Sequence, residues 1–130
     1  MAIARDTTAK NVQPLPGAVV RRGLVGATVA AGEIVELQSD GYWDPAVATA
    51  AVIRKLGIAL NAGTAAGVDR IDIVEHGPVN CLTGASPGAL VYVSDTDGEP
   101  SESAGTKSTV IGKSESATVL YVEPQIIDFT

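Results

Sequence analysis

The sequence predicts an all-β protein, a small barrel or sandwich, and two observations carry this prediction. First, residues 31–41 return as residues 87–98, so that Gly32 and Gly88 stand 56 positions apart. Each copy reads as a turn glycine, an alternating apolar run and an Asp-Gly turn. Second, fourteen glycines and seven prolines separate short apolar runs at the spacing of strands. A chain of 130 residues fits one domain.

The repeat continues beyond these segments, with 52–58 matching 108–114 and 70–74 matching 118–122. We therefore expect two tandem β repeats, at roughly 23–76 and 79–123, within a single β domain that spans 17–130.

Residues 1–16 are predicted to form an extended N-terminal arm. They show no steady apolar periodicity, and Pro14-Leu15-Pro16-Gly17 interrupts any regular element where they end. From residue 18 onward the alternating runs predict strands at 18–22, 27–29, 34–38, 53–60, 70–75, 79–82, 90–94, 110–113 and 118–123.

At most one short helix is expected, at 45–51, where Asp44 would be the N-cap and Pro45 the first helical residue. The same residues could instead form an apolar loop over one open end of the barrel. The matching segment of the second copy, 99–106, is polar and predicts an exposed loop. These two loops are where the copies differ most, so function could have diverged there.

The charge is unevenly distributed. The chain carries a formal net charge of −6, which argues against nonspecific nucleic-acid binding, because that binding needs a basic face. The first 22 residues are nevertheless basic, with Arg5, Lys10, Arg21 and Arg22 against Asp6. A basic arm on an acidic body suggests an acidic partner, although exposed arms are also charged for solubility.

Several classes of site and location are excluded or disfavoured. The single cysteine, Cys81, excludes an intrachain disulfide and a cysteine-based zinc site, and its apolar surroundings favour a small buried side chain. No apolar run approaches the roughly 20 residues of a membrane span, and residues 1–6 lack the apolar core of a signal peptide. We expect a soluble product, made in a cytoplasm, that needs no cofactor and no metal.

Gly84-Ala85-Ser86-Pro87-Gly88 matches the Gly-x-Ser-x-Gly nucleophile elbow of α/β-hydrolases. The elbow needs a backbone N–H after the serine, and Pro87 has none. The only histidine, His76, precedes the serine, whereas the hydrolase triad places it last. In the repeat, Pro87-Gly88 falls on the turn Ala31-Gly32. The string therefore predicts a turn, and we expect no enzymatic activity.

Other candidate residues admit two interpretations each. His76 at the end of a predicted strand favours a turn residue over a base or ligand. The carboxylates around Asp40 and Asp95 favour hairpin turns over a calcium loop, whose spacing they do not match. Tyr42 and Trp43 could contact a partner or stack on a sugar, but a lone tryptophan favours packing.

The order of these motifs resembles the capsid decoration, or cement, proteins of phage heads, the lambda-type class and related phage structural proteins. The resemblance lies in three features: the order of turn glycine, apolar strand and Asp-Gly turn; the middle strand Leu56-Gly57-Ile58-Ala59-Leu60; and Val110-Ile111-Gly112-Lys113-Ser114 before the last strand. It covers about 17–123.

The resemblance implies a β-tulip-like fold and a homotrimer on the outer surface of the virion head, with the major capsid protein as partner and no direct contact with nucleic acid or membrane. It also implies that the N-terminal arm adds to strands of the capsid shell and is mobile in the free protein. On this chain Arg5 and Lys10 would contact the capsid, and Arg21 and Arg22 would lie at the root of the arm or at a subunit boundary.

Other interpretations remain. A carbohydrate- or host-surface-binding module would use Tyr42, Trp43 and the loop at 46–51. The strong duplication could instead suit the base of a fibre or spike. A hydrolase would use Ser86.

Overall fold

The structure, a computed structural model, describes residues 3–49 and 55–126 and confirms the all-β prediction. Within these residues, helical structure is confined to one 3₁₀ helix, η1 (Ala9–Asn11). The strands are β1 (Ala4–Arg5), β2 (Gln13–Pro14), β3 (Val19–Leu24), β4 (Ile34–Leu37), β5 (Trp43–Pro45), β6 (Leu56–Ala59), β7 (Arg70–Asn80), β8 (Leu82–Thr83), β9 (Leu90–Val93), β10 (Pro100–Ser101), β11 (Thr109–Ser114) and β12 (Val119–Ile126).

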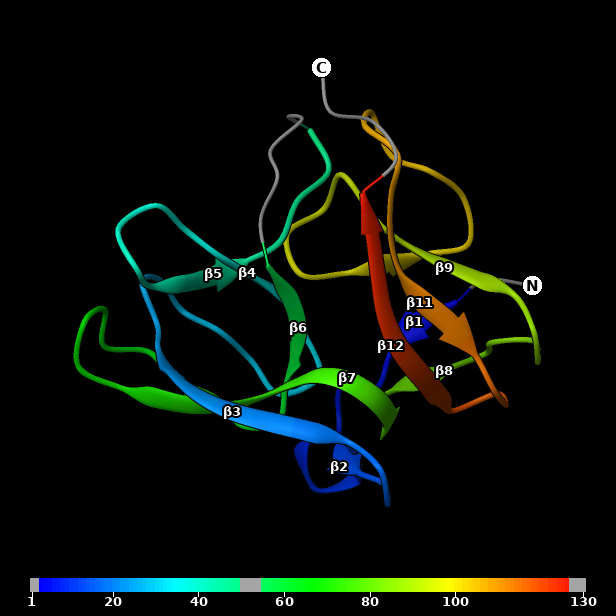
Figure 1. Cartoon of the computed structure of the whole chain (residues 1–130), viewed down its shortest axis with the longest axis horizontal. Helices are drawn as coiled ribbons and strands as arrows, with labels where there is room; N and C mark the ends of the chain where they lie inside the picture. Colours follow the sequence, from blue (N-terminus) through cyan, green and yellow to red (C-terminus); the bar gives the residue numbers. More distant parts are fainter. Residues whose placement is uncertain (1–2, 50–54, 127–130) are drawn as a thin grey trace.

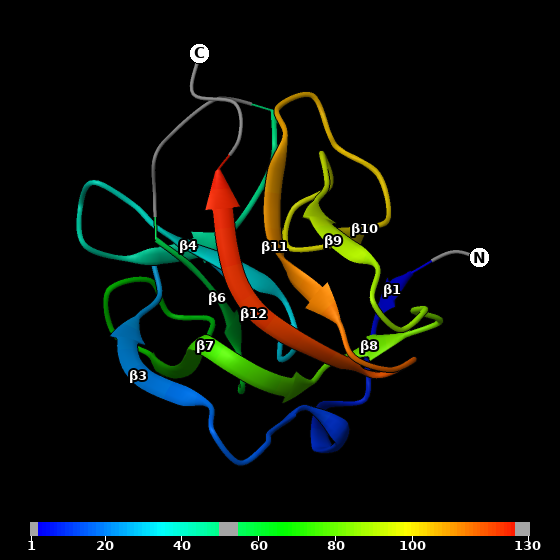
Figure 2. The same ribbon diagram turned by 45° about the vertical axis from the view of Figure 1, so that its right-hand side comes forward.

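One curled sheet carries both copies of the repeat (Figures 1 and 2). Its strand order is β10-β9-β11-β12-β7-β6-β4-β5. The first four strands belong to the second copy and the last four to the first copy. Read outward from the centre, the two halves have equivalent strands in the same order. The copies join where β12 pairs with β7 in antiparallel fashion. The strands β2 and β3 lie along the other edge of β7.

Equivalent turns in the two copies make equivalent hydrogen bonds. The N–H of Gly32 donates to the carbonyl of Ala59 at 2.7 Å, and the N–H of Gly88 donates to the carbonyl of Ser114 at 2.7 Å. Both glycines have positive φ, +88° and +80°, which side chains rarely adopt. The sequence repeat is therefore also a structural repeat at these turns.

The register corrects the predicted alignment of the later strands by one residue. Gly57 lies opposite Val35, and Gly112 lies opposite Val91. The middle strands are therefore equivalent at an offset of 55, not 56, and the last strands at 47, not 48. Alternating aliphatic strings match at more than one alignment, so only the hydrogen-bonded register decides between them.

Two apolar cores lie on the two faces of the first copy. The main core fills the space between the copies and includes Ile34, Ile58 and Val74 of the first copy with Val91 and Leu120 of the second. The second core lies on the other face of the first copy and is formed by Val25, Val29, Val35, Trp43, Ala59, Ile71 and Ile73.

Several predicted elements differ from the observed ones. The predicted strands at 70–75 and 79–82 are replaced by the long β7, which continues through Gly77. Gly77 has a φ of +104° and lies so close to Ala18 that a side chain would not fit, and it allows both Val74 and Val79 to face the main core. The predicted strand at 27–29 is a loop with one isolated bridge at Val29.

The loops after the first hairpins also differ from expectation. Residues 45–49 are not helical, while residues 50–51 of the predicted helix lie outside the described residues. The apolar-loop alternative fits better, because Ala46 and Ala48 are buried in the main core. In the second copy, the predicted exposed loop 99–106 contains β10, in which Pro100 is buried.

Candidate interaction surface

The arm residues 3–14 lie on the body, whereas the sequence predicted a free extended arm. β1 pairs with β8, and the N–H of Asp6 donates to the carbonyl of Cys81 at 2.9 Å. Val12 is buried in the main core. These contacts do not test the predicted mobility of the arm in the free protein, which stays a prediction. Residues 1–2 lie outside the described residues.

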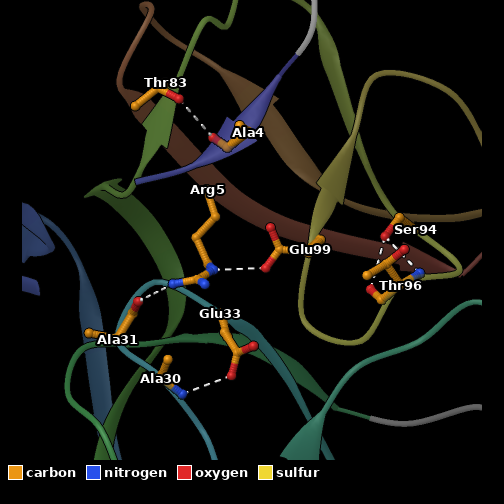
Figure 3. Close-up of polar contacts among 9 residues, drawn as sticks. All are labelled: Ala4, Arg5, Ala30, Ala31, Glu33, Thr83, Ser94, Thr96 and Glu99. Atoms are coloured by element: carbon orange, nitrogen blue, oxygen red, sulfur yellow. Dashed lines mark hydrogen bonds and ion pairs between the residues drawn. The ribbon is translucent and has the colours of Figure 1, made fainter. Parts of the chain in front are cut away.

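Arg5 connects the arm to both copies (Figure 3). Its Nε lies 2.8 Å from an Oε of Glu99 in the second copy, and its Nη1 donates to the carbonyl of Ala31 in the first copy at 3.1 Å. The arginine side chain is 16% exposed. Arg5 is therefore engaged within the chain and would have to leave Glu99 to pair with a carboxylate of another protein.

Asp6 organises the rest of the arm. Its carboxylate accepts hydrogen bonds from the N–H of Thr8 at 2.9 Å and from the amide of Asn11 at 3.2 Å, and these contacts hold η1. Burial, with a smaller contribution from the negative charge of Asp6, raises the pKa of the Cys81 thiol to about 12. Cys81 is therefore a buried neutral side chain, as the sequence favoured.

Lys10 is the exposed cation of the arm. It lies in η1 on the outside of the molecule, and among the described residues no salt bridge to it is found. It is the arm residue best placed for contact with a partner.

β3 forms a basic and apolar edge. Val19 and Val20 are 52% and 45% exposed, and Arg21 and Arg22 are also exposed. Within the described strands β3 pairs only with β7. We call residues 19–22 the β3 edge.

The two arginines of the β3 edge differ in their surroundings. Arg21 lies 2.8 Å from Glu75 and its guanidinium is 5.6 Å from the centre of the Trp43 ring. Arg22 lies opposite Asp72 in the register. Arg21 thus covers the second core, while Arg22 is the more available of the two.

The aromatic pair separates into one packed and one partly exposed residue. Trp43 is 1% exposed in the second core, and its ring lies against Gly23, where a Cβ would come within 2.5 Å of it. Stacking on a sugar needs an exposed ring face, so the packing interpretation holds for Trp43. Tyr42 is half-buried near Gly67.

The string at 84–88 forms a turn before β9, with Gly88 at a φ of +80°. The carbonyl of Ser86 accepts a hydrogen bond from the hydroxyl of the buried Ser114. The sequence placed His76 at the end of a strand, but the residue lies within β7. Its Nε2 is 4.0 Å from a carboxylate oxygen of Glu123.

The carboxylate of Asp95 stabilises the loop that follows it. The N–H and hydroxyl of Thr106 donate to Asp95, and these bonds lower the pKa of the Asp95 carboxyl. Among the described residues no cluster of three or more His, Cys, Asp or Glu side chains could hold a metal ion.

One surface escaped the sequence-based search. A hollow of about 380 Å³ on the outside of β11 and β12 is lined by Gly88, Lys113, Ser114, Glu115, Tyr121 and Glu123. Leu90, 39% exposed, lies beside it. We call this surface the outer face. The sequence indicates this surface only through two differences between the copies. Lys113 and Tyr121 stand where the first copy has the apolar residues Ile58 and Val74.

Comparison with known proteins adds no family. No protein-family model matches the chain, and no curated protein sequence matches it. In the described part of the chain no helix is long and apolar enough to cross a membrane.

Proposed function

We propose that this protein is a virion structural protein, a decoration or cement protein that binds the outer surface of a phage head and acts without catalysis. The observation that carries the proposal is the basic N-terminal segment, residues 3–22, lying along the outside of an acidic, duplicated β body. It joins the resemblance described above, in which such a segment binds the major capsid protein.

The arm is held in a way that permits exchange. Its strands β1 and β2 have two residues each, and the Arg5–Glu99 pair is partly exposed. Short exposed pairings are among the least stable parts of a fold, so β1 can leave β8 while the buried Val12 keeps the following residues on the body. A capsid strand and a capsid carboxylate would then replace β8 and Glu99 as its partners.

The carbohydrate- or host-surface-binding alternative is not retained. It relied on an exposed aromatic pair, and Trp43 is buried. A homotrimer at local three-fold positions, located on the outer head surface, remains part of the proposal.

The test uses expanded heads of the phage that encodes the chain, prepared without it. We expect the purified wild-type chain to co-sediment with the heads, and imaging of the decorated particles to place its density at the outer three-fold positions. A Lys10→Glu variant should bind at least tenfold more weakly at low salt, because the capsid contact is electrostatic.

The matched control is Arg70→Glu, which makes the same charge change at the first residue of β7. β2 pairs with the opposite end of that strand. Failure of the wild-type chain to bind the heads would reject the proposed function. Equal binding of the two variants would reject the role of the arm alone. Point substitution is preferable to deleting residues 2–14, since that deletion would also remove the buried Val12.

A further inference from the structure

The two copies of the repeat bury opposite faces. The first-copy residues Ile34, Ile58 and Val74 face the main core, and their equivalents in the second copy are Leu90, Lys113 and Tyr121 on the outside. Conversely, Val35 and Ile73 belong to the second core, while their equivalents Val91 and Leu120 face the main core.

The first copy is therefore covered on both faces and the second copy on one. The second core of the first copy is closed by residues 25–29 and Trp43. The outer face of the second copy carries Leu90, Tyr121 and a hollow of about 380 Å³ whose surface is mostly apolar. Apolar patches that are rimmed by polar residues mark interaction sites when they are large, and Leu90 with the hollow extends this patch across β9, β11 and β12.

We propose that the outer face binds the β3 edge of a second copy of this chain. The two surfaces are complementary in composition. The β3 edge offers two exposed valines and Arg22. The outer face offers Leu90 and Tyr121, and the charges at its rim are the two carboxylates of Glu115 and Glu123 against the single cation Lys113. Three of the four large apolar side chains that are most exposed among the described residues, Val19, Val20 and Leu90, fall on these two surfaces.

The two surfaces are also adjacent on one molecule. Val19 lies opposite His76, whose ring meets the ring of Tyr121 edge-on at 5.4 Å and whose Nε2 lies 4.0 Å from Glu123. A contact between unlike surfaces repeats from copy to copy, and it gives a ring where the rotation closes and an open filament where it does not. The proposal includes closure into a ring, which the measurement below tests. The inference does not require the proposed function, because heads take no part in it.

Sedimentation velocity of the purified chain tests the interface. We expect the wild-type chain to sediment as one discrete oligomer. Arg22→Glu and Glu123→Arg should each raise the dissociation constant about tenfold or more, because each places like charges across the contact. Glu102→Lys, at an exposed residue that follows β10, is the matched control and should sediment as wild type.

A charge-swapped double variant provides the decisive measurement. Arg22→Glu combined with Glu123→Arg in one chain should recover the oligomer, since opposite charges meet again at every contact whatever the number of copies in the ring. Circular dichroism of each variant establishes that it is folded. A monomeric wild-type chain, or single variants that associate like wild type, would overturn the inference, as would a folded double variant that stays dissociated.

Discussion

The paired turn glycines allow the docking of the arm to be measured with an internal control. Gly32 and Gly88 have nearly the same φ and make the same hydrogen bond, but their surroundings differ. A Cβ at Gly32 would lie 3.2 Å from the carbonyl oxygen of Asp6 and 3.3 Å from Val12. At Gly88 no atom lies within 4 Å of that position. Alanine at either site strains the backbone, and only at Gly32 does it also press on the arm.

The magnitudes follow from these two contributions. Left-handed backbone at a residue with a Cβ costs roughly 1–2 kcal/mol, so Gly88→Ala should lower the free energy of unfolding by about that amount. Overpacking adds about 1–2 kcal/mol at Gly32, at the low end of the usual range because the arm can shift. The expected loss for Gly32→Ala is therefore about 2–4 kcal/mol.

Two measurements at equal protein concentration check this prediction. Urea unfolding gives the losses, and amide hydrogen exchange reports on the arm, where the N–H of Asp6 donates to Cys81. Exchange at Asp6 should quicken in Gly32→Ala and stay unchanged in Gly88→Ala. Equal losses in the two variants, or arm exchange that does not respond to Gly32→Ala, would refute the reasoning.

Three further predictions concern the cores and the copies. Trp43→Ala should cost about 3–5 kcal/mol in urea unfolding, because the ring is fully buried, and a loss under 1 kcal/mol would contradict its packing role. Ser114→Ala should cost about 1–2 kcal/mol, because the buried hydroxyl serves the Ser86 carbonyl; an unchanged midpoint would show that this bond contributes nothing. Burial raises the pKa of Cys81 from 9.0 to about 12, so the unfolded chain loses this proton first and stability should fall as pH rises above 9 toward 12, by about 1.4 kcal/mol per pH unit. Urea unfolding between pH 8 and 10 checks the slope, which Cys81→Ala should reduce, and equal slopes in both chains would be the contrary result.

Several features of the fold follow directly from the sequence. The repeat located β4 and β9 at the same offset as their turn glycines, because a turn with positive φ requires glycine there. It also showed that the serine at position 86 belongs to a turn. The burial of Cys81 followed from its apolar neighbours.

The site was less accessible from the sequence. Arg5 was singled out as a capsid contact, which stays a prediction, whereas its partner within the chain, Glu99, is 94 positions away and was not foreseen. The continuity of β7 through Gly77 was missed, because a Gly-Pro pair ordinarily ends a strand, whereas here the glycine follows a bend of the sheet. The outer face was missed because Tyr121 and Leu90 also fit a buried strand.

The sequence by itself determined that the chain is all-β, that it is duplicated, and where its turns lie, because these depend on local backbone preferences and on alternation along one strand. Only the tertiary structure decided which face of each copy is covered and where the arm lies. A period of two specifies that a strand has an apolar face, but what covers that face depends on strands far away in the chain. Val35 and Val91 occupy equivalent positions and yet belong to different cores for this reason.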